Sequence, residues 1–266
     1  QERFVARLGL SKYKKHLILK GGFLLLSQHV TPFRPTVDID MLGIRVDQDP
    51  ESLKNIIQEI AAIDLPDGAM FDTKNMTSSV IKEDADYEGL RFTFTARLGV
   101  IKSKMQIDIG FGDAVPGGFI DDRLPTMLED SDFPTILYYP FESIIAEKLQ
   151  AIVYLGYANS RMKDFYDILF LASNNTFSSK RLKKAISATF RKRETDLESR
   201  FFIYDDEYKS AKAALWKSYQ RKIQTTRNDD FENAVEKLNT FIEPVLTKRK
   251  SVMTWQPESW KWKELR

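Results

Sequence analysis

The sequence contains no cysteine and only two histidines, His16 and His29. Without cysteine there can be no disulfide, thiolate zinc site or cysteine nucleophile, which fits a reducing compartment. Two histidines are too few for the histidine-rich sites that zinc usually occupies. Any metal is therefore expected to be a hard cation held by carboxylate oxygens.

Long apolar runs are missing as well. No run approaches the roughly 20 residues that span a bilayer, and no charged-then-apolar leader with a small-residue cleavage site opens the chain. We therefore expect a cytoplasmic protein with no membrane partner. With 266 residues, 42% of them hydrophobic and 29% charged, the chain is long enough for two globular domains.

The charges are distributed unevenly although they nearly cancel. Residues 1–150 hold 17 Lys and Arg against 23 Asp and Glu, whereas residues 151–266 hold 23 against 15, so the two parts carry −6 and +8. This asymmetry suggests that chemistry and polyanion binding are divided between the two parts. A solvated helical surface rich in lysine is the alternative explanation.

The hydrophobic periodicity changes near Pro140. Before it, a short N-terminal segment and the apolar run 23–29 predict helices, and Pro32 and Pro35 bracket a turn. The pattern then predicts a strand over residues 36–46, an amphipathic helix over 52–63, a β-rich run over 77–82, and a hairpin of two strands over 90–98 and 103–111.

After Pro140 the period is helical, and five helices are predicted, over residues 141–155, 161–172, 179–190, 206–220 and 228–242. The sequence therefore predicts an α+β protein. Residues 1–140 form a domain with a mixed sheet flanked by helices, and residues 141–266 form an all-helical, basic domain.

Two aspartates, Asp38 and Asp40, flank Ile39 within the strand predicted over residues 36–46. Side chains alternate along a strand, so both carboxylates share one face, with their Cα atoms roughly 6.6 to 7 Å apart. Asp108 lies within another apolar strand, where an unpaired charge would be costly. The three acids could complete a site for two metal ions about 3.5 to 4 Å apart. Alternatively, the first two acids belong to an edge strand and face water without a ligand.

Gly21 and Gly22 stand at the start of the helix predicted over residues 23–29. A Gly-Gly turn there lets backbone N–H groups approach an anion closely, and the helix dipole adds partial positive charge. Phosphates bound at this turn would lie near metals held by the aspartates. A tight turn without a ligand is the alternative.

Lys148 falls on the apolar face of the helix predicted over residues 141–155. On a helical wheel that starts at Phe141, it lies at about 340°, inside the arc of apolar residues. A lysine there either extends its ammonium to solvent along its aliphatic stem or directs it at buried anions. A triphosphate would be such an anion.

Asp164 and Asp167 are predicted to point away from the core face of the next helix, which consists of Met162, Phe165, Tyr166 and Leu169. The pattern by itself therefore predicts that Asp164 is a surface carboxylate paired with Arg161, three residues earlier.

Seven cations gather within 14 residues around the helix predicted over 179–190: Lys180, Arg181, Lys183, Lys184, Arg191, Lys192 and Arg193. Apolar residues follow helical spacing between them, so the cations are predicted to face solvent. Clustered cations attract a phosphate backbone without reading its sequence, which makes Lys183, Lys184, Lys192 and Arg193 candidate RNA contacts. A merely solvated basic face is the alternative.

Five sequence elements resemble, in the same order, those of the AbiEii/AbiGii toxin nucleotidyltransferases, relatives of the MenT toxins within the DNA polymerase β-like superfamily. The elements are LKGG at 19–22, RPTVDIDM at 34–41, QIDIGFGD at 106–113, FESIIAEKLQAIV at 141–153 and RMKDFYDI at 161–168. Gly22 stands where many relatives have serine, so a hydroxyl contact to phosphate is absent and backbone N–H groups must serve.

The resemblance implies a nucleotidyltransferase that uses Mg²⁺ or Mn²⁺ to move a nucleoside monophosphate from an NTP to an acceptor hydroxyl, with release of pyrophosphate. Asp38, Asp40 and Asp108 would hold the metals. Lys148 would bind the nucleotide phosphates, and Asp164 would be a further catalytic residue, both contributed to the cleft by residues 141–266. The remaining candidate nucleotide-binding residues are Gly21, Gly22, Arg34 and Arg161.

The resemblance also implies the toxin of a toxin–antitoxin or phage-abortive-infection system, an RNA acceptor such as the 3′ end of tRNA, and an antitoxin encoded nearby. One alternative is a nucleotidyltransferase for small molecules, of the antibiotic-modifying type, for which a non-basic helical domain would be expected. Another is a non-catalytic nucleotide- or RNA-binding module, which the loss of a carboxylate would indicate.

Overall fold

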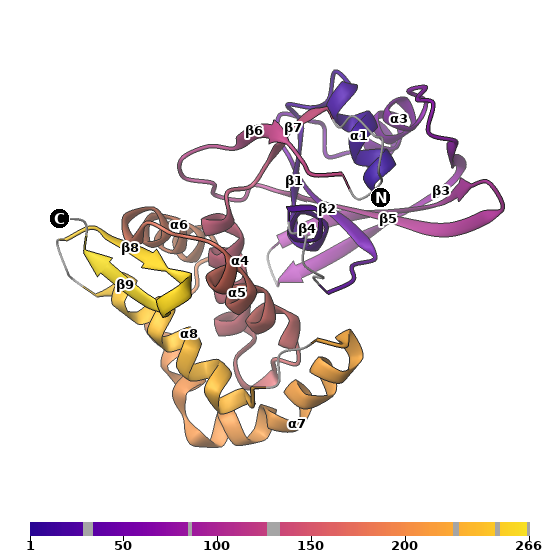
Figure 1. Ribbon diagram of the computed structural model, residues 1–266. Helices are drawn as coiled ribbons and strands as arrows, with labels where there is room; N and C mark the ends of the chain where they lie inside the picture. The colour runs from indigo at the N-terminus through magenta and orange to yellow at the C-terminus, as the bar shows by residue number, and fades with distance from the viewer. Residues whose placement is uncertain (29–33, 85–86, 127–133, 226–228, 248–250, 265–266) are drawn as a thin grey trace. The chain divides into compact units, whose positions relative to one another are not determined.

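The computed structural model describes residues 1–28, 34–84, 87–126, 134–225, 229–247 and 251–264. The chain forms two compact units (Figure 1): the first contains residues 1–113 and 118–139, and the second contains residues 114–117 and 140–266. Three positions used in the sequence predictions lie outside the described residues: His29, Pro32 and Asn228.

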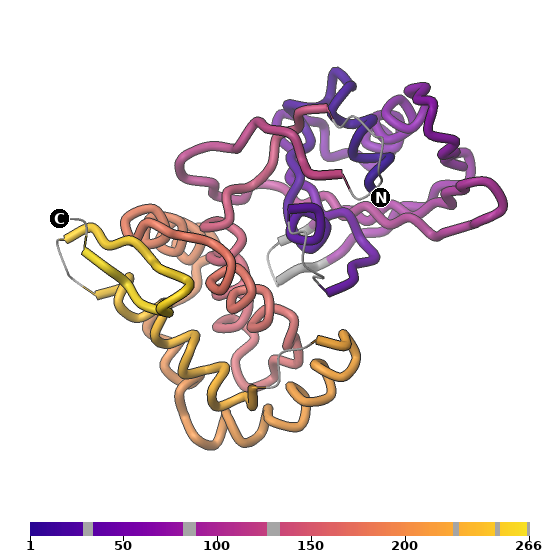
Figure 2. Tube along the Cα trace, viewed as in Figure 1, coloured from indigo at the N-terminus to yellow at the C-terminus, as the bar shows by residue number. Residues whose placement is uncertain are grey.

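The first unit is built on a mixed sheet. Its strands are β1 (Leu17–Lys20), β2 (Asp38–Gly43), β3 (Ala69–Asp84), β4 (Tyr87–Leu98), β5 (Ile101–Phe111), β6 (Ile120–Arg123) and β7 (Thr135–Tyr138), in the order β3-β4-β5-β2-β1-β7-β6. Strand β2 pairs in parallel with β5 and antiparallel with β1, so segments far apart in the sequence lie side by side (Figure 2).

Around the centre of β2, β5 and β4, the sheet has one apolar face and one polar face. On the apolar face, Ile39 of β2, Ile107 of β5 and Phe92 of β4 stand in register and are fully buried. Helix α1 (Glu2–Leu10) contributes Phe4 to this side, with its ring 6.1 Å from that of Phe94. The alternation of each strand therefore leaves its polar residues on the opposite face.

Two more helices belong to this unit. Helix α2 (Gly21–Gln28) follows β1 directly and packs against β2. Helix α3 (Pro50–Ala61) begins after Asp49, whose side chain accepts a hydrogen bond from the Ser52 N–H at 2.9 Å. Such an N-cap satisfies one of the free N–H groups at a helix start, and proline fits the first helical position.

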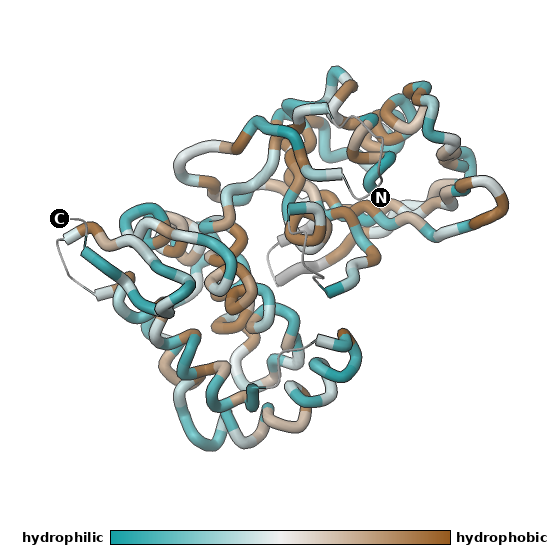
Figure 3. Tube along the Cα trace, viewed as in Figure 1, coloured by the Kyte–Doolittle hydropathy of each residue, from teal (hydrophilic) through white to brown (hydrophobic). Residues whose placement is uncertain are grey.

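The second unit is largely helical. Its helices are α4 (Phe141–Leu155), α5 (Met162–Asn174), α6 (Ser179–Lys192), α7 (Asp206–Ile223) and α8 (Phe231–Leu246), with short 3₁₀ segments at residues 156–158, 197–204 and 257–259. Apolar residues concentrate on α4 and α5 (Figure 3), and most of them are buried. The α+β fold class and all five predicted helices are confirmed.

The prediction that residues 141–266 are all-helical was wrong. Strands β8 (Met253–Gln256) and β9 (Lys261–Glu264) form an antiparallel hairpin. Trp255 is fully buried, its ring lies 4.8 Å from that of Phe241, and its indole N–H donates to the Ala172 carbonyl at 2.7 Å. The hairpin completes the helical core through long-range contacts, which four-residue strands do not reveal in a sequence pattern.

Short strands of the first unit were also missed. Strands β1, β6 and β7 have four residues each, too few for a clear period. Strand β3 begins at Ala69, whereas the prediction began at residue 77. The first half was missed because it carries several polar residues and because its register shifts between Asp72 and Thr77, which interrupts the alternation. Within the described ranges, none of the helices combines the length and the apolar character that crossing a membrane requires.

Candidate functional site

Three aspartates converge on the polar face of the sheet. Asp38 and Asp40 alternate with the buried Ile39 on β2, and the parallel register of β2 and β5 places Asp40 beside Asp108. One carboxylate oxygen of each aspartate lies within 4.8 Å of an oxygen of each of the others. Asp108 is 5% exposed and the other two are partly exposed. The edge-strand alternative was wrong, because β2 is paired on both sides.

Neutral donors hold the two carboxylates of β2. The Thr36 hydroxyl donates to Asp38 at 2.6 Å, and the Gly22 N–H donates to Asp40 at 3.3 Å. Hydrogen bonds of this kind restrict the orientation of a carboxylate. The chain segments next to the two acids therefore help to set the directions of their side chains.

The Gly-Gly turn is explained by its neighbours. Gly21 has a φ of +72°, and a Cβ at this position would overlap the Asp40 carboxylate. At Gly22, a Cβ would lie 2.9 Å from Thr36 Oγ1 and 3.2 Å from a guanidinium nitrogen of Arg34. The glycines therefore allow the backbone to approach Asp40, and the Gly22 N–H, predicted to face a phosphate, bonds this carboxylate.

Arg91 is a charged residue of this site that the sequence analysis missed. It stands opposite Asp108 in the antiparallel register of β4 and β5, and its guanidinium donates to both carboxylate oxygens, at 2.9 and 2.7 Å. The hydrogen bonds to Asp108 raise the pKa of Arg91 against the opposing effect of burial, and Asp38 and Asp40 add to the increase. The sequence feature that could have revealed Arg91 is the strict alternation of residues 90–98. Together with the short turn that follows, this alternation fixes the register of β4 against β5.

Lys20 and Asp113 form a second ion pair of the first unit that was not predicted. Their side chains are 5% and 3% exposed, and ammonium and carboxylate are 2.5 Å apart. The Tyr139 hydroxyl donates to the same carboxylate at 3.2 Å, and Lys20 stands opposite Asp40 in the register of β1 and β2. Lys20 follows the apolar residues 17–19, which is the signal that could have singled out this lysine.

In the second unit, Lys148 is surrounded by acids. Its ammonium lies 3.0 Å from Asp164 and 2.6 Å from Asp167, and the Arg161 guanidinium lies 2.8 Å from Asp164. Both carboxylates are fully buried, and the Lys148 side chain is 11% exposed. Of the two predicted alternatives for Lys148, the one that directs its ammonium at buried anions holds, and these anions are carboxylates of the protein.

The prediction that Asp164 and Asp167 point away from the core was wrong, although the pairing of Asp164 with Arg161 is confirmed. A helical wheel of α5 cannot show the cation that α4 brings to these acids. Burial by itself raises the pKa of Asp164, but Lys148, Arg161 and Lys163 outweigh burial and hold that pKa below its ordinary value. Asp164 therefore remains ionised while fully buried.

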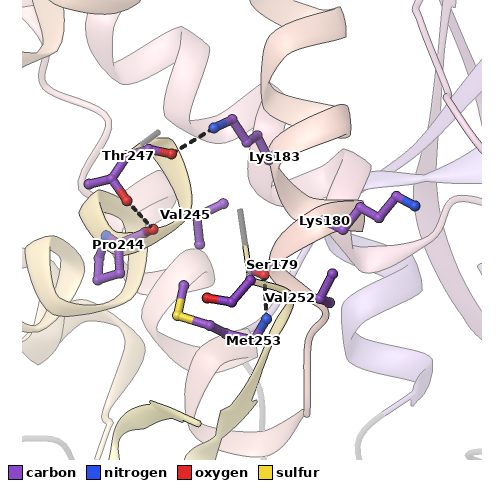
Figure 4. A pocket seen from close by; sticks show the side chains of 9 residues that line it. Ser179, Lys180, Lys183, Pro244, Val245, Thr247, Val252 and Met253 are labelled. Carbon is purple, nitrogen blue, oxygen red and sulfur yellow. Dashed lines mark hydrogen bonds between the residues drawn. The ribbon is translucent and has the colours of Figure 1, made fainter. Parts of the chain in front are cut away.

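The cations in and next to α6 differ in exposure and in their partners. The exposed ones are Lys180, Arg181, Lys184, Arg191 and Lys192. Of these, Arg181 also pairs with Glu142 of α4 at 3.1 Å. Lys183 donates instead to the carbonyl of Thr247, after the end of α8, at 2.7 Å. It stands at the rim of a pocket of about 290 Å³, where the Ser179 hydroxyl accepts from the Met253 N–H (Figure 4).

Arg193 does not face solvent, and this part of the prediction was wrong. Its side chain is 6% exposed and donates to the Gln150 side-chain oxygen at 3.0 Å. The helix ends at Lys192, so helical spacing no longer sets the direction of the next residue, and a buried amide on α4 binds it. The apolar residues between the cations are buried as predicted.

The donor set of the three aspartates fits a hard divalent cation. It offers carboxylate oxygens alone, which suit Mg²⁺ or Mn²⁺ and not the softer metals that prefer nitrogen or sulfur. The ligand oxygens lie within 4.8 Å of one another, a spread that ions about 3.5 to 4 Å apart can share.

A family model for AbiEii nucleotidyl transferase toxins of type IV toxin–antitoxin systems matches residues 3–237 of the chain. Two crystal structures from Helicobacter pylori are similar to it, JHP933 and a proposed nucleotidyltransferase, each at 15% identity and a TM-score of 0.42. The first alignment covers 83% of this chain and 90% of the other, and the second covers 85% and 94%. No curated protein matches the sequence.

Proposed function

Because the chain belongs to the AbiEii family of nucleotidyl transferase toxins of type IV toxin–antitoxin systems, we propose that it transfers a nucleoside monophosphate from an NTP to RNA, with the 3′ end of tRNA as acceptor. The observation that carries this proposal is the convergence of Asp38, Asp40 and Asp108 within 4.8 Å on one face of the sheet. Family membership also implies an NTP substrate and a cognate antitoxin.

In this reaction the acceptor hydroxyl oxygen bonds to the α-phosphorus of the NTP, the bond to the β-phosphate breaks, and pyrophosphate leaves. Asp38, Asp40 and Asp108 are the residues that would hold Mg²⁺ or Mn²⁺, which when bound neutralises phosphate charge and makes a hydroxyl more acidic. Asp108 is the most buried of the three acids and is assigned to accept the hydroxyl proton. Thr36 and Gly22 keep the other two carboxylates oriented.

Lys148 and Arg161 are assigned to the nucleotide phosphates. An ammonium has three donors, and Asp164 and Asp167 fix the direction of Lys148 through two short ion pairs. A cation held in this way loses little freedom when it binds a phosphate, which is the advantage of preorganised charge. Asp164 thus acts in the proposed mechanism by positioning both cations.

The glycine turn and Arg34 are the nucleotide contacts that we assign to the first unit. Arg34 is only 9% exposed, and its guanidinium lies near the position that a Cβ of Gly22 would occupy. A guanidinium offers planar donors that suit an anion such as a phosphate.

The exposed cations of α6 are assigned to the RNA acceptor: Lys180, Arg181, Lys184, Arg191 and Lys192. These residues offer several charges along one solvent-facing helix, which suits a phosphate backbone. Lys183 and Arg193, two of the original candidates, have protein partners and are expected to contribute less, and so is Arg181, which pairs with Glu142.

The test is to incubate the protein with total RNA and each labelled NTP in turn, in the presence of Mg²⁺. We expect one NTP to label the tRNA fraction when the wild-type protein is used. The Asp40→Asn variant should transfer no label to RNA. The control variant Asp72→Asn, which changes an aspartate of β3 outside the triad, should transfer label normally. Absence of label in RNA with all four NTPs would refute the proposed acceptor.

A further inference from the structure

The polar face of the sheet continues from the three aspartates along the hairpin of β4 and β5. The register of these two strands is unbroken, so every second residue shares the face of Asp108. From the aspartates toward the turn, the rows on this face are Asp108 with Arg91, Gln106 with Thr93, Lys104 with Thr95, and Lys102 with Arg97. The turn, at residues 99–100, projects from the sheet (Figure 1). The face thus changes from carboxylates, through neutral hydrogen-bonding groups, to cations.

The cations at the far end of this face, Arg97, Lys102 and Lys104, are called the hairpin cations below. All three are exposed, and none of the described residues forms an ion pair with their side chains or accepts a hydrogen bond from them. Residues 89–107 contain no Asp or Glu. Asp72 of β3 lies on the same face, but β4 separates it from β5. The hairpin cations are therefore available to a polyanion.

The distance from the aspartates shows what the hairpin cations can serve. At about 3.3 Å per residue, Lys104 lies about 13 Å and Lys102 about 20 Å from Asp108 along β5. Salt screens exposed charges beyond about 8 Å, so these cations act little on ions held at the aspartates. An RNA chain whose terminal hydroxyl lies at the aspartates can extend over this distance.

We propose that the hairpin cations bind the phosphate backbone of the RNA acceptor next to its reacting end, so that the face of β4 and β5 directs this end to the aspartates. The inference rests on the proposed function, because it takes RNA as the acceptor and the aspartates as the site of transfer. Thr93, Thr95 and Gln106, between the cations and the aspartates, carry the hydroxyl and amide groups that commonly contact phosphate and sugar oxygens.

The contrasting possibility is an anionic membrane surface. Val100 and Ile101, at the turn of the hairpin, are 97% and 65% exposed, and apolar residues next to cations suit a lipid surface. A membrane contact at the turn does not require the cations to share the face of the aspartates, whereas an RNA path to the site does. This shared face favours RNA.

The experiment measures the binding of labelled tRNA by fluorescence anisotropy between about 50 and 200 mM salt. The hairpin variant combines Arg97→Gln, Lys102→Gln and Lys104→Gln. Its affinity should be lower than that of wild type by about tenfold or more. The slope of log affinity against log salt should fall by about two to three, at about 0.7 to 0.9 for each lost phosphate contact. In the transfer assay its KM for RNA should rise by a similar factor, and its KM for the NTP should match wild type.

Two controls separate these contacts from net charge and from folding. Exchanging Arg for Lys and Lys for Arg at the three hairpin positions keeps the charges, and this variant should bind tRNA nearly as wild type does. The second control combines Lys15→Gln, Arg45→Gln and Arg123→Gln, which remove three exposed cations at the opposite end of the sheet. It makes the same change in net charge and should keep the affinity and the slope.

The inference is overturned if the hairpin variant, folded as judged by circular dichroism, keeps the tRNA affinity, slope and KM of wild type, or if the second control lowers them equally. Transfer of label to RNA by that unchanged variant would leave the proposed function intact. Loss of binding to phosphatidylglycerol vesicles with unchanged tRNA affinity would assign the cations to a membrane and also overturn the inference. If tRNA binding depends on the hairpin cations but no NTP labels RNA, the proposed transfer is refuted and the hairpin is still supported as an RNA surface.

Discussion

Replacing Lys148 by methionine should destabilise the second unit, because this lysine is a counter-ion of two fully buried carboxylates. The ammonium lies 3.0 Å from Asp164 and 2.6 Å from Asp167. Methionine preserves the apolar stem, so packing is nearly unchanged and the loss is electrostatic. A lysine that merely extended to solvent would tolerate this substitution or gain stability.

The magnitude follows from the charges that remain. Removal of Lys148 takes a close counter-ion away from two fully buried carboxylates. Breaking a buried ion pair from one side costs about 3 to 5 kcal/mol. Because the Arg161 side chain is 40% exposed and screened by water, it cannot replace Lys148. We expect a loss of about 3 kcal/mol, close to the lower end.

Urea unfolding at neutral pH, followed by far-ultraviolet circular dichroism, measures this loss. Lys184→Met, at an exposed position of α6, is the control and should remain within about 0.5 kcal/mol of wild type. Adding Asp167→Asn to Lys148→Met restores the balance and should recover part of the stability, with a coupling of about 0.5 to 3 kcal/mol. Equal stability of Lys148→Met and wild type would refute the role of Lys148 as counter-ion.

Three other predictions address the glycine turn, the basic helix and the response to acid. Gly21→Ala should weaken Mn²⁺ binding more than Gly99→Ala. Both glycines have a positive φ, but only a methyl group at position 21 would displace a carboxylate, that of Asp40. Equal effects of the two substitutions in a Mn²⁺ titration would contradict this. Gln at both Lys184 and Lys192 should lower tRNA affinity and flatten its salt dependence in filter binding, and an unchanged slope would exclude this face. The pKa of Asp164 is lowered by folding, so its stabilisation is complete above its ordinary value of 3.8 and is lost as pH falls through the lower folded value. Wild type should therefore lose more stability than Asp164→Asn between about pH 5 and pH 3 in urea unfolding, and parallel curves would contradict the lowered pKa.

The residues that the sequence predicted well are those governed by local period. Alternation along β2 and β5 was enough to place Asp38 and Asp40 on one face and to single out Asp108 as a charge in an apolar strand. Helical spacing likewise placed Lys148 on the core side of α4. In each case the feature depends on the direction of a side chain relative to its own element, which the sequence period determines.

The residues that it missed or misplaced depend on partners from other elements. Asp164 appears exposed on the wheel of α5, yet Lys148 of α4 makes its burial tolerable. Arg91 and Asp108 are neighbours because the register of β4 and β5 places them opposite each other. Arg193 points inward because it can donate a hydrogen bond to the side-chain oxygen of Gln150. Such pairings are set by tertiary packing, which overrides the expectation that charged side chains face solvent.

The most direct test of the central claim compares the fate of two labels in one NTP. With RNA, Mg²⁺ and the NTP that supports transfer, the account predicts that label in the α-phosphate enters the RNA while label in the γ-phosphate leaves as pyrophosphate, in equal amounts. Asp40→Asn, folded as judged by circular dichroism, should show neither change. Entry of the γ label into RNA, or undiminished α-label transfer by Asp40→Asn, would contradict nucleotidyl transfer at the three aspartates.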